Sequence, residues 1–556
     1  MVSFDCAERD CPGRVFNWFQ RCLGANRDHD RRRRYLVANC LPQLARANSS
    51  NGLIIQSSEA TGAAGGGLEL IYLVWTLPAL VVIAAIASGR VGTPVASIIG
   101  LFAALAVALT TAPHGFRIPD AIFSLARGAW IGWIVVPYFL GGLFFWQMAI
   151  RPGDAAMPVE SSSPDARTRR RLLFTACFLI GPFAESTTGF GIGIIGTMML
   201  VRRLDVQPVY LLAFSLLSQT MLLWGAMGSG SIFAAAFAHA DPTTLTVNTS
   251  FFLVAFNVLG LPLYWRMADR AGIVADWRER ISETFWLSAS LAFVIAATAL
   301  LGPETAMLAA YGPMIVLRYL VDERPDRGEI ILAVRKLAPF AILIGWLVLT
   351  RLLPPLTHFL EQTGRMEPFA GAPEWSPLFH AGTWLVVAAI LTGALRGHAS
   401  AFPGEIRAVW KRGRLAVLTI ITFSMMAELL SGSGVADGLA RGLFAALGRW
   451  AIVLTPIISA VSGALANSGS VANGLFMASQ ASLATEAGLN VALVIALQHM
   501  AALSLQMVSP VRMSIVCSLA GTPGRERDAY RVMLPFAAAT VTVLLISSIL
   551  IAIRLL

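Results

Sequence analysis

The chain has 556 residues, of which 56% are hydrophobic and only 13% are charged, and its mean hydropathy is +0.68. Soluble proteins carry roughly 25% charged residues, so the composition excludes a soluble globular protein. The formal net charge of +10 does not indicate nucleic-acid binding, because Arg and Lys accumulate in the cytoplasmic loops of membrane proteins. We therefore expect an all-α, multi-pass membrane protein, with the lipid bilayer as its surroundings.

The first 67 residues differ in composition from the rest of the chain. They are polar and Arg-rich, with the run RRRR at 31–34, and they lack the apolar stretch of a signal peptide. Their four cysteines lie near His29 in a spacing that matches no zinc pattern: Cys6, Cys11, Cys22 and Cys40. For residues 1–67 we expect a disordered leader, or a true start of the protein near Leu68. A metal site is the less favoured reading, and we expect no cofactor.

From Leu68 onward, many segments reach the roughly 20 apolar residues that cross a bilayer. We predict about twelve membrane-crossing helices, near 68–88, 91–111, 129–149, 208–238, 249–266, 284–302, 305–321, 337–353, 382–396, 414–430, 489–519 and 533–553. Two further stretches, 172–201 and 450–485, are apolar but interrupted by small polar residues. Neither of these two reads as a simple crossing helix.

The basic residues give the orientation. Four loops are rich in Arg and Lys and are placed in the cytoplasm: 151–171, 266–283, 318–336 and 396–414. Loops 239–248 and 366–380 contain neither residue type, so they are placed outside.

The stretch 172–201 contains GPFAESTTGFGIGIIG, and Arg residues flank it on both sides. Because both flanks favour the cytoplasm, a single crossing fits poorly. We predict a re-entrant hairpin of two half-helices, about 172–184 and 190–201, that turns at ESTTG. Irregular backbone at that depth is tolerated only where protein or a water-filled cavity covers it.

A similar pattern recurs in the second half of the chain. A polar tip at Ala184 is followed 41 residues later, at Gly225, by a break in the next span, and a second tip at Ala466 is followed 41 residues later by a break at Met507. The loops give the two halves opposite orientations, as in the inverted repeats of secondary transporters. We divide the chain into a first repeat, linker helices and a second, inverted repeat, at 68–265, 266–336 and 337–556. A duplication unrelated to transport is the alternative.

The tips and breaks would meet near the middle of the membrane, where half-helix N-termini favour an anion. The candidate substrate-binding residues supply hydroxyl, amide or backbone groups there: Ser186, Thr187, Thr188, Gly189, Gly228, Ser229, Asn467, Ser468, Gly469, Ser470, Asn473, Gln506 and Ser509. For the small residues, the alternative is helix packing. Arg512 could hold a carboxylate through two hydrogen bonds; the alternative is an Arg that snorkels to the membrane surface.

Glu185 is the candidate for proton coupling, because a carboxylate inside a membrane is costly unless it is paired or protonated. The alternative is a structural, hydrogen-bonded acid. His499 is read more readily as a packing residue, and Glu304 sits at a short turn where it could simply be exposed. No P-loop is present, so ATP-driven transport is unsupported. An integral-membrane enzyme is disfavoured, since the loops carry basic runs rather than acids, His or metal ligands.

The motifs of the chain from about Leu68 onward resemble the L-lactate permease family, bacterial symporters of lactate and glycolate with protons. The likeness lies in the order and spacing of Glu185 with Thr188-Gly189-Phe190-Gly191, Trp224-Gly225-Ala226-Met227-Gly228, Gly302-Pro303-Glu304, Asn473-Gly474-Leu475-Phe476 and Met507-Val508-Ser509-Pro510. The resemblance implies an ion-transporter architecture with re-entrant hairpins and elevator-like alternating access.

The chain departs from the family pattern at two positions. The family has Asp where this chain has Gly469 and Lys where it has Gln506, so Arg512 would replace the lost positive charge. We therefore expect proton-coupled symport of a small monocarboxylate, a lactate- or glycolate-like 2-hydroxy acid. Another organic anion, with sodium as the coupling ion, is the alternative. A homo-oligomer is compatible with this reading.

Overall fold

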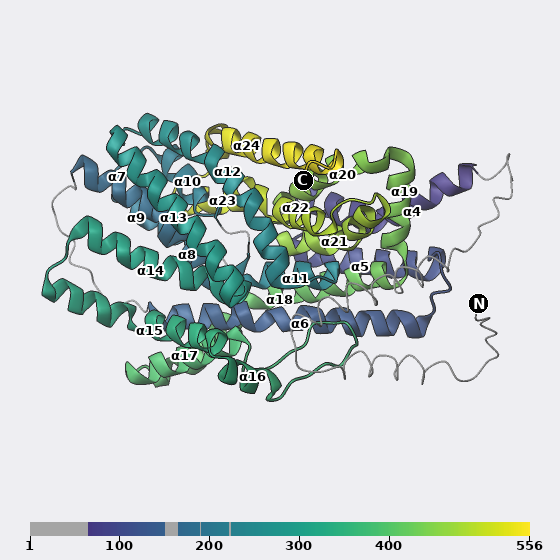
Figure 1. Ribbon diagram of the computed structural model, residues 1–556, viewed down its shortest axis with the longest axis horizontal. Helices are drawn as coiled ribbons and strands as arrows, with labels where there is room; N and C mark the ends of the chain where they lie inside the picture. The colour runs from purple at the N-terminus through teal and green to yellow at the C-terminus, as the bar shows by residue number, and fades with distance from the viewer. Residues whose placement is uncertain (1–64, 151–164, 190, 222–223) are drawn as a thin grey trace, which may run out of the picture. The chain divides into compact units, whose positions relative to one another are not determined.

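The computed structural model describes residues 65–150, 165–189, 191–221 and 224–556, and the regular elements in these ranges are all helices (Figure 1). The predicted leader and its four cysteines lie outside the described residues, apart from residues 65–67. From Gly67 to Leu556 the chain forms one compact unit. Within the described ranges, ten helices are long and apolar enough to cross a membrane. The predicted number was about twelve; of the remaining predicted spans, 208–238 and 382–396 form shorter helices, and 305–321 lies in the 21-residue helix Pro303–Glu323.

The first three helices coincide with the first three predicted spans: α4 (Gly65–Ala87), α5 (Thr93–Thr111) and α6 (Ile118–Ala149). α6 begins well before the predicted start at 129, because a capping box fixes its first turn: the Asp120 carboxylate accepts the Arg117 N–H at 2.9 Å. α6 ends at Ala149, as predicted. It packs against α17 (Ala381–Leu395) and α18 (Phe402–Gly432).

Two helical arms joined by a glycine turn occupy the stretch after residue 165. The first arm consists of α7 (Ala166–Thr175), the π-helical turn η2 (Ala176–Ile180) and α8 (Gly181–Thr188), and the second is α9 (Ile192–Arg202). The predicted turn at ESTTG is wrong, because α8 continues through Thr188. Gly189 and Gly191 then adopt φ angles of +70° and +77°, which glycine reaches without strain. Glu185 to Thr188 therefore form the last helical turn of the first arm.

The remaining helices follow the predicted spans in order. The first half continues with α10 (Pro208–Leu217), η3 (Ala226–Gly228), α11 (Ser229–Ala238) and α12 (Pro242–Arg270). The middle of the chain forms α13 (Trp277–Leu301), α14 (Pro303–Glu323), α15 (Arg327–Leu352) and α16 (Pro354–Gln362). The proposed domain boundaries after residues 265 and 336 fall inside α12 and α15.

After α17, η4 (Ala399–Ala401) and α18, the second half contains α19 (Val435–Leu447), η5 (Gly448–Trp450), α20 (Ala451–Ala466), α21 (Gly469–Glu486), α22 (Val491–Ser504), η6 (Leu505–Val508), α23 (Pro510–Leu519) and α24 (Glu526–Ala552). α19 was not predicted; its sequence was read as a loop. α20, α21 and α22 pack against one another (Figure 1).

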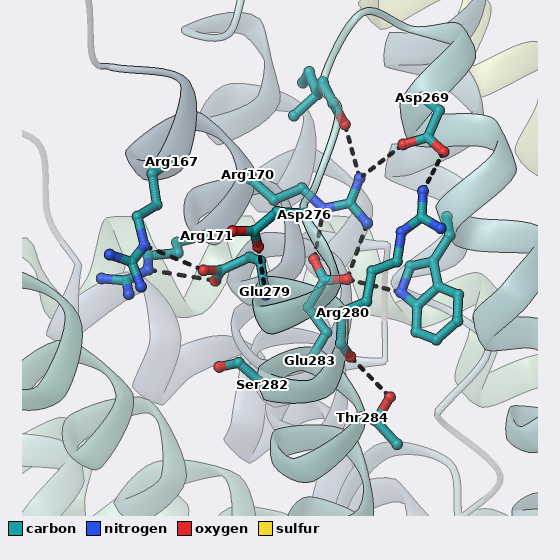
Figure 2. Close-up of polar contacts among 12 residues, drawn as sticks. Arg167, Arg170, Arg171, Asp269, Asp276, Glu279, Arg280, Ser282, Glu283 and Thr284 are labelled. Atoms are coloured by element: carbon teal, nitrogen blue, oxygen red, sulfur yellow. Dashed lines mark hydrogen bonds and ion pairs between the residues drawn. The ribbon is translucent and has the colours of Figure 1, made fainter.

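A buried ion pair fastens the base of the first arm to α13 (Figure 2). The Arg170 guanidinium donates to both oxygens of Glu283, at 2.6 and 2.9 Å, and both side chains are only 1% exposed. The Trp265 indole N–H donates to Glu283 at 2.8 Å, and Arg170 also donates to the Ile273 carbonyl at 2.8 Å. At the start of α7, hydrogen bonds from the Thr168 side chain and backbone lower the pKa of Asp165. The base of the arm is thus held by well-satisfied polar groups.

A second acid extends this network towards α14. Glu279 accepts hydrogen bonds from Arg167 at 3.3 Å and Arg171 at 3.4 Å, and the Arg318 guanidinium lies 3.6 Å away. Together with Glu279, these arginines belong to three of the loops predicted to be cytoplasmic. Because they share one network, these three loops lie at the same end of the molecule.

Candidate functional site

Each polar tip lies against the helix break of its own half. A Cβ atom added at Gly189 would lie 2.6 Å from the Ala226 Cβ, and one added at Gly469 would lie 3.1 Å from the Gln506 Nε2. In both halves, the two contacting residues are 37 positions apart in the sequence. The two halves therefore bring corresponding segments together, and a glycine permits the close approach in each.

Arg512 joins the second tip and both breaks. Its Nε donates to Asn467 at 2.7 Å and its Nη2 donates to Gln506 at 2.6 Å. Its Nη1 donates to Gln219, which follows α10 just before the first break. In the described part of the chain no carboxylate forms an ion pair with Arg512, so the acceptors of this cation are three neutral amide oxygens. Asn467, Gln506 and Arg512 were predicted site residues, and the structure brings them together.

Glu185 lies in the last turn of α8 and caps the N-terminus of α9. Its two carboxylate oxygens accept the N–H groups of Gly191 at 3.0 Å and Gly193 at 2.9 Å. An anion is favoured at this position because the first N–H groups of a helix have no partner within the helix. Glu185 also interacts electrostatically with Arg512, which links the acid of the first tip to the cation beside the second break.

The three hydroxyl residues at the end of α8 bond back into their own helix. Ser186 and Thr187 donate to the Phe183 carbonyl at 2.8 and 2.9 Å, and Thr188 donates to Ala184 at 3.0 Å. All three side chains are buried. Their hydroxyl hydrogens are therefore occupied, and only their oxygen lone pairs remain to accept a hydrogen bond.

The hydroxyl and amide residues of the second tip have different surroundings. Ser468 and Ser470 are half-buried, whereas Asn473 and Ser509 are fully buried. The Ser509 hydroxyl and the Asn473 side-chain oxygen have no hydrogen-bond partner among the described residues. Such orphaned buried groups are rare in proteins, so Ser509 in the second break and Asn473 in α21 each leave one buried polar atom unused.

His499, in α22, lies between α21 of the second half and α11, the helix that follows the first break. One ring nitrogen, Nδ1, lies 3.0 Å from the Asn473 side-chain nitrogen, and the other, Nε2, lies 3.0 Å from the Ser231 hydroxyl. The amide N–H donates to Nδ1, so Nε2 carries the proton and donates to Ser231. His499 therefore has two polar partners from α21 and α11, a role that its apolar neighbours in the sequence did not reveal.

Two predicted residues make other contacts. Gly228 lies against the first residue of α14, since an added Cβ would be 2.5 Å from the Pro303 carbonyl carbon. Ser229 begins α11 and lies beside Gly225. Neither residue forms a hydrogen bond with Arg512. The first break therefore contacts α14 through Gly228 and Arg512 through Gln219.

A cavity of about 1010 Å³ lies beside α11, α14 and α15. His239 and Asp241 line it from one of the loops predicted to be external, and Gly371 and Pro373 line it from the other. The two loops that lack basic residues therefore share one cavity. Glu304 also lines this cavity, so it does not occupy the simply exposed turn considered from the sequence.

Comparison with known proteins agrees with these motifs. The sequence profile described as L-lactate permease matches residues 368–556. The L-lactate permease of Salmonella typhi is 24% identical over 530 residues, which cover 84% of this chain and 93% of the relative. The chain is thus similar to L-lactate permeases over most of its length. It is also similar to glycolate permease GlcA of Escherichia coli, which is 23% identical over 536 residues (84% of this chain and 93% of the relative).

The L-lactate permease of Bacillus subtilis is 22% identical over 550 residues, covering 86% of this chain and 95% of the relative. These relatives are permeases rather than enzymes, and they are bacterial. The similarity to these bacterial permeases and the ten long apolar helices among the described residues indicate a multi-pass protein of the bacterial cytoplasmic membrane.

The prediction from the family pattern missed two polar residues that the structure adds to the site: Gln219 and Ser231. Both lie in apolar sequence within a few residues of the first break, at Gly225. A polar residue close to a helix break inside a membrane segment is itself a signal, and this rule would have selected Gln219.

Proposed function

We propose that the chain is a secondary active transporter that carries a small monocarboxylate, such as lactate or glycolate, across the cytoplasmic membrane together with a proton. The relatives are named for these two substrates. The observation that carries the proposal is the Arg512 guanidinium, which faces three neutral amide oxygens from both halves of the chain.

A carboxylate would compete well for Arg512. Hydrogen bonds between a guanidinium and a carboxylate are about twice as strong as those to neutral acceptors, and two can form at once. The substrate would displace the amide oxygens of Gln219 and Gln506 and would leave Asn467 in place. The two halves would then be held together through the substrate instead of directly through Arg512.

The remaining tip residues would recognise the rest of the substrate. Ser468, Ser470 and the Ser509 hydroxyl, which has no hydrogen-bond partner among the described residues, would bind the 2-hydroxyl group of lactate or glycolate. Glu185 would carry the coupled proton, since a proton on its carboxylate would release the N–H groups that it now caps. In this proposal the two tips belong to re-entrant hairpins of an inverted repeat, and the glycine contacts of tip and break support that arrangement.

Uptake of radiolabelled lactate and glycolate into cells that lack their own permeases tests this function. We expect uptake that a protonophore abolishes and that replacing sodium by potassium leaves unchanged. Sodium-dependent, protonophore-resistant uptake would support the alternative coupling ion. Absence of uptake for every 2-hydroxy acid would refute the proposed substrate class.

The Arg512 variants test the site. Arg512→Gln removes the cation, and we expect the apparent affinity for lactate to fall about 10- to 100-fold, because a charged hydrogen-bonded contact contributes roughly 1.5–3 kcal/mol. Arg512→Lys keeps the charge but loses the two-pronged geometry, so an intermediate loss is expected. Arg203→Gln, at an exposed position on the same molecule, is the control. Equal KM values for Arg512→Gln and the control would refute a carboxylate-binding role.

A further inference from the structure

The cavity beside α14 contains one guanidinium that is held firmly in place. Arg351 lies at the end of α15, and its side chain is only 5% exposed. It donates to the Thr350 hydroxyl at 2.7 Å and to the Phe379 carbonyl at 2.9 Å, and its guanidinium carbon lies 4.2 Å from the centre of the Phe379 ring. These three contacts come from uncharged groups, so Arg351 would keep its position if its charged partner left.

That charged partner is Glu304, at 2.9 Å from the Arg351 Nη2. Glu304 is in the first turn of α14 and its side chain is 22% exposed, so it is the more accessible member of the pair. The Tyr138 hydroxyl hydrogen-bonds to the same carboxylate. If Glu304 is protonated, its O–H can therefore donate a hydrogen bond to the Tyr138 hydroxyl oxygen.

The other ionisable groups of the cavity are mostly acids. Asp241, Glu361, Glu367 and Glu374 line it together with Glu304. Arg365 is the second guanidinium in the lining, and it is paired with Glu374 and Glu367. Carboxylates in excess over cations at the mouth raise the local concentration of protons.

Two histidines, His239 and His380, also line the cavity. His380 accepts the Gly382 N–H through Nδ1 at 3.1 Å and lies 2.9 Å from the Ile134 carbonyl through Nε2. Both ring nitrogens therefore have backbone partners. Three of the helices that pack against α14 carry charged groups elsewhere. In α8, Glu185 accepts the Gly191 N–H at the tip of the first hairpin. The charges of α7 and of the start of α13 belong to the network in Figure 2.

We propose that the Arg351–Glu304 pair is an uptake site at which one monocarboxylate and one proton bind together from the cavity. This inference rests on the proposed function for its substrate class. The substrate carboxylate takes the place of Glu304 on Arg351, and a proton from water is transferred to the Glu304 carboxylate. The pair is neutral before the substrate arrives, and a second carboxylate beside one guanidinium in a partly buried site favours protonation of one of the two acids.

The position of the pair gives it a route to the tips. Pro303 directly precedes Glu304 and contacts Gly228 in the first helix break, and the same break contacts Gly189 at the first tip through Ala226. If the first turn of α14 shifts when Glu304 leaves Arg351, the shift would therefore move the first helix break directly, because Pro303 contacts Gly228.

Direct binding to the purified full-length protein tests the inference. Lactate binding is measured by calorimetry between pH 5.5 and 8, and proton uptake is followed with a pH dye in weakly buffered solution. All proteins carry Arg512→Gln and Glu185→Gln, so that the carboxylate and proton sites of the proposed function do not contribute. With Arg351 and Glu304 intact we expect about one proton per lactate bound, and a Kd that rises about tenfold per pH unit. Glu304→Gln mimics the protonated acid, so its binding should take up no proton and its Kd should not vary with pH.

Three further variants provide a control for Glu304→Gln and test the role of the Arg351 cation. Glu361→Gln removes another cavity carboxylate and should behave as the protein with Arg351 and Glu304 intact. Arg351→Gln should weaken binding about tenfold or more at every pH, and Arg351→Lys, which preserves the charge if Arg351→Gln fails to fold, should weaken it less. Proton uptake that persists in Glu304→Gln would overturn this inference but leave the proposed function standing. A wild type that binds and transports no 2-hydroxy acid would instead refute the proposed function.

Discussion

Glu185 caps a helix and is also the acid that we propose carries the coupled proton. Its sequence position predicted a polar tip and an acid in need of a partner, and the structure supplies partners in the Gly191 and Gly193 N–H groups. The sequence could not show the direction of bonding for its neighbours. Ser186 and Thr187 were expected to face a ligand, but Ser and Thr in helices often bond back to the preceding turn, and both do so here.

We predict that Glu185→Gln lowers the free energy of unfolding by about 1–2 kcal/mol, because an amide can accept only one of the two cap bonds and carries no charge for the helix N-terminus. If Glu185 carries the proton, the variant should also lose the response of lactate uptake to an imposed pH gradient in proteoliposomes. Glu486→Gln, at an exposed helix end, is the control. A variant with normal pH-gradient response would leave Glu185 with the structural role alone.

At the scale of elements, the glycines of the first hairpin decide how closely α8 and α9 can pack. A Cβ at Gly193 would collide with the Gly181 carbonyl oxygen and lie 2.7 Å from the Glu185 Cβ, whereas a Cβ at Gly196 would meet nothing within 4 Å. The sequence predicted that two arms pack in this stretch. It could not place the turn, because ESTTG and GFG both carry turn-forming residues and only the packing of Gly189 on Ala226 selects the second.

Gly193→Ala and Gly196→Ala form a matched pair in one helix. We expect Gly193→Ala to destabilise the protein by about 1–3 kcal/mol through overpacking, which lowers its Tm in detergent. Gly196→Ala should be neutral or raise the stability by up to about 1 kcal/mol, since Ala is the better helix former. Thermal unfolding followed by intrinsic fluorescence distinguishes the two. Equal Tm shifts would contradict the close packing of α8 on α9.

For the whole molecule, the charges of the loops were the most informative part of the sequence. They separated the basic loops from 239–248 and 366–380, and the structure groups three of the basic loops in one network and the other two around one cavity. Contacts between the halves were beyond the sequence. The Arg512–Gln219 bond joins residues 293 positions apart, and no local pattern in a single sequence encodes such a pairing.

The predicted orientation can be tested with single cysteines in a cysteine-free background. Gln362→Cys, at the end of α16 beside the cavity, should react with a membrane-impermeant maleimide in intact spheroplasts. Arg327→Cys, at the start of α15, should react only after permeabilisation, because its loop is predicted to be cytoplasmic. Both positions are exposed. Labelling in the reverse order would invert the topology, and labelling of both in intact spheroplasts would show that α15 does not cross the membrane.

The buried Arg170–Glu283 pair also has a consequence for how the protein is made. Its two members are 113 residues apart in the chain, so the ribosome completes Arg170 well before α13 exists. An unpaired guanidinium in a buried site costs roughly 3–5 kcal/mol. The first arm therefore cannot settle into its final place when it is synthesised; it must wait near the membrane surface until α13 has been inserted. Assembly of this half is then completed by a late step, and a chain truncated before Glu283 should leave the first hairpin open to proteases.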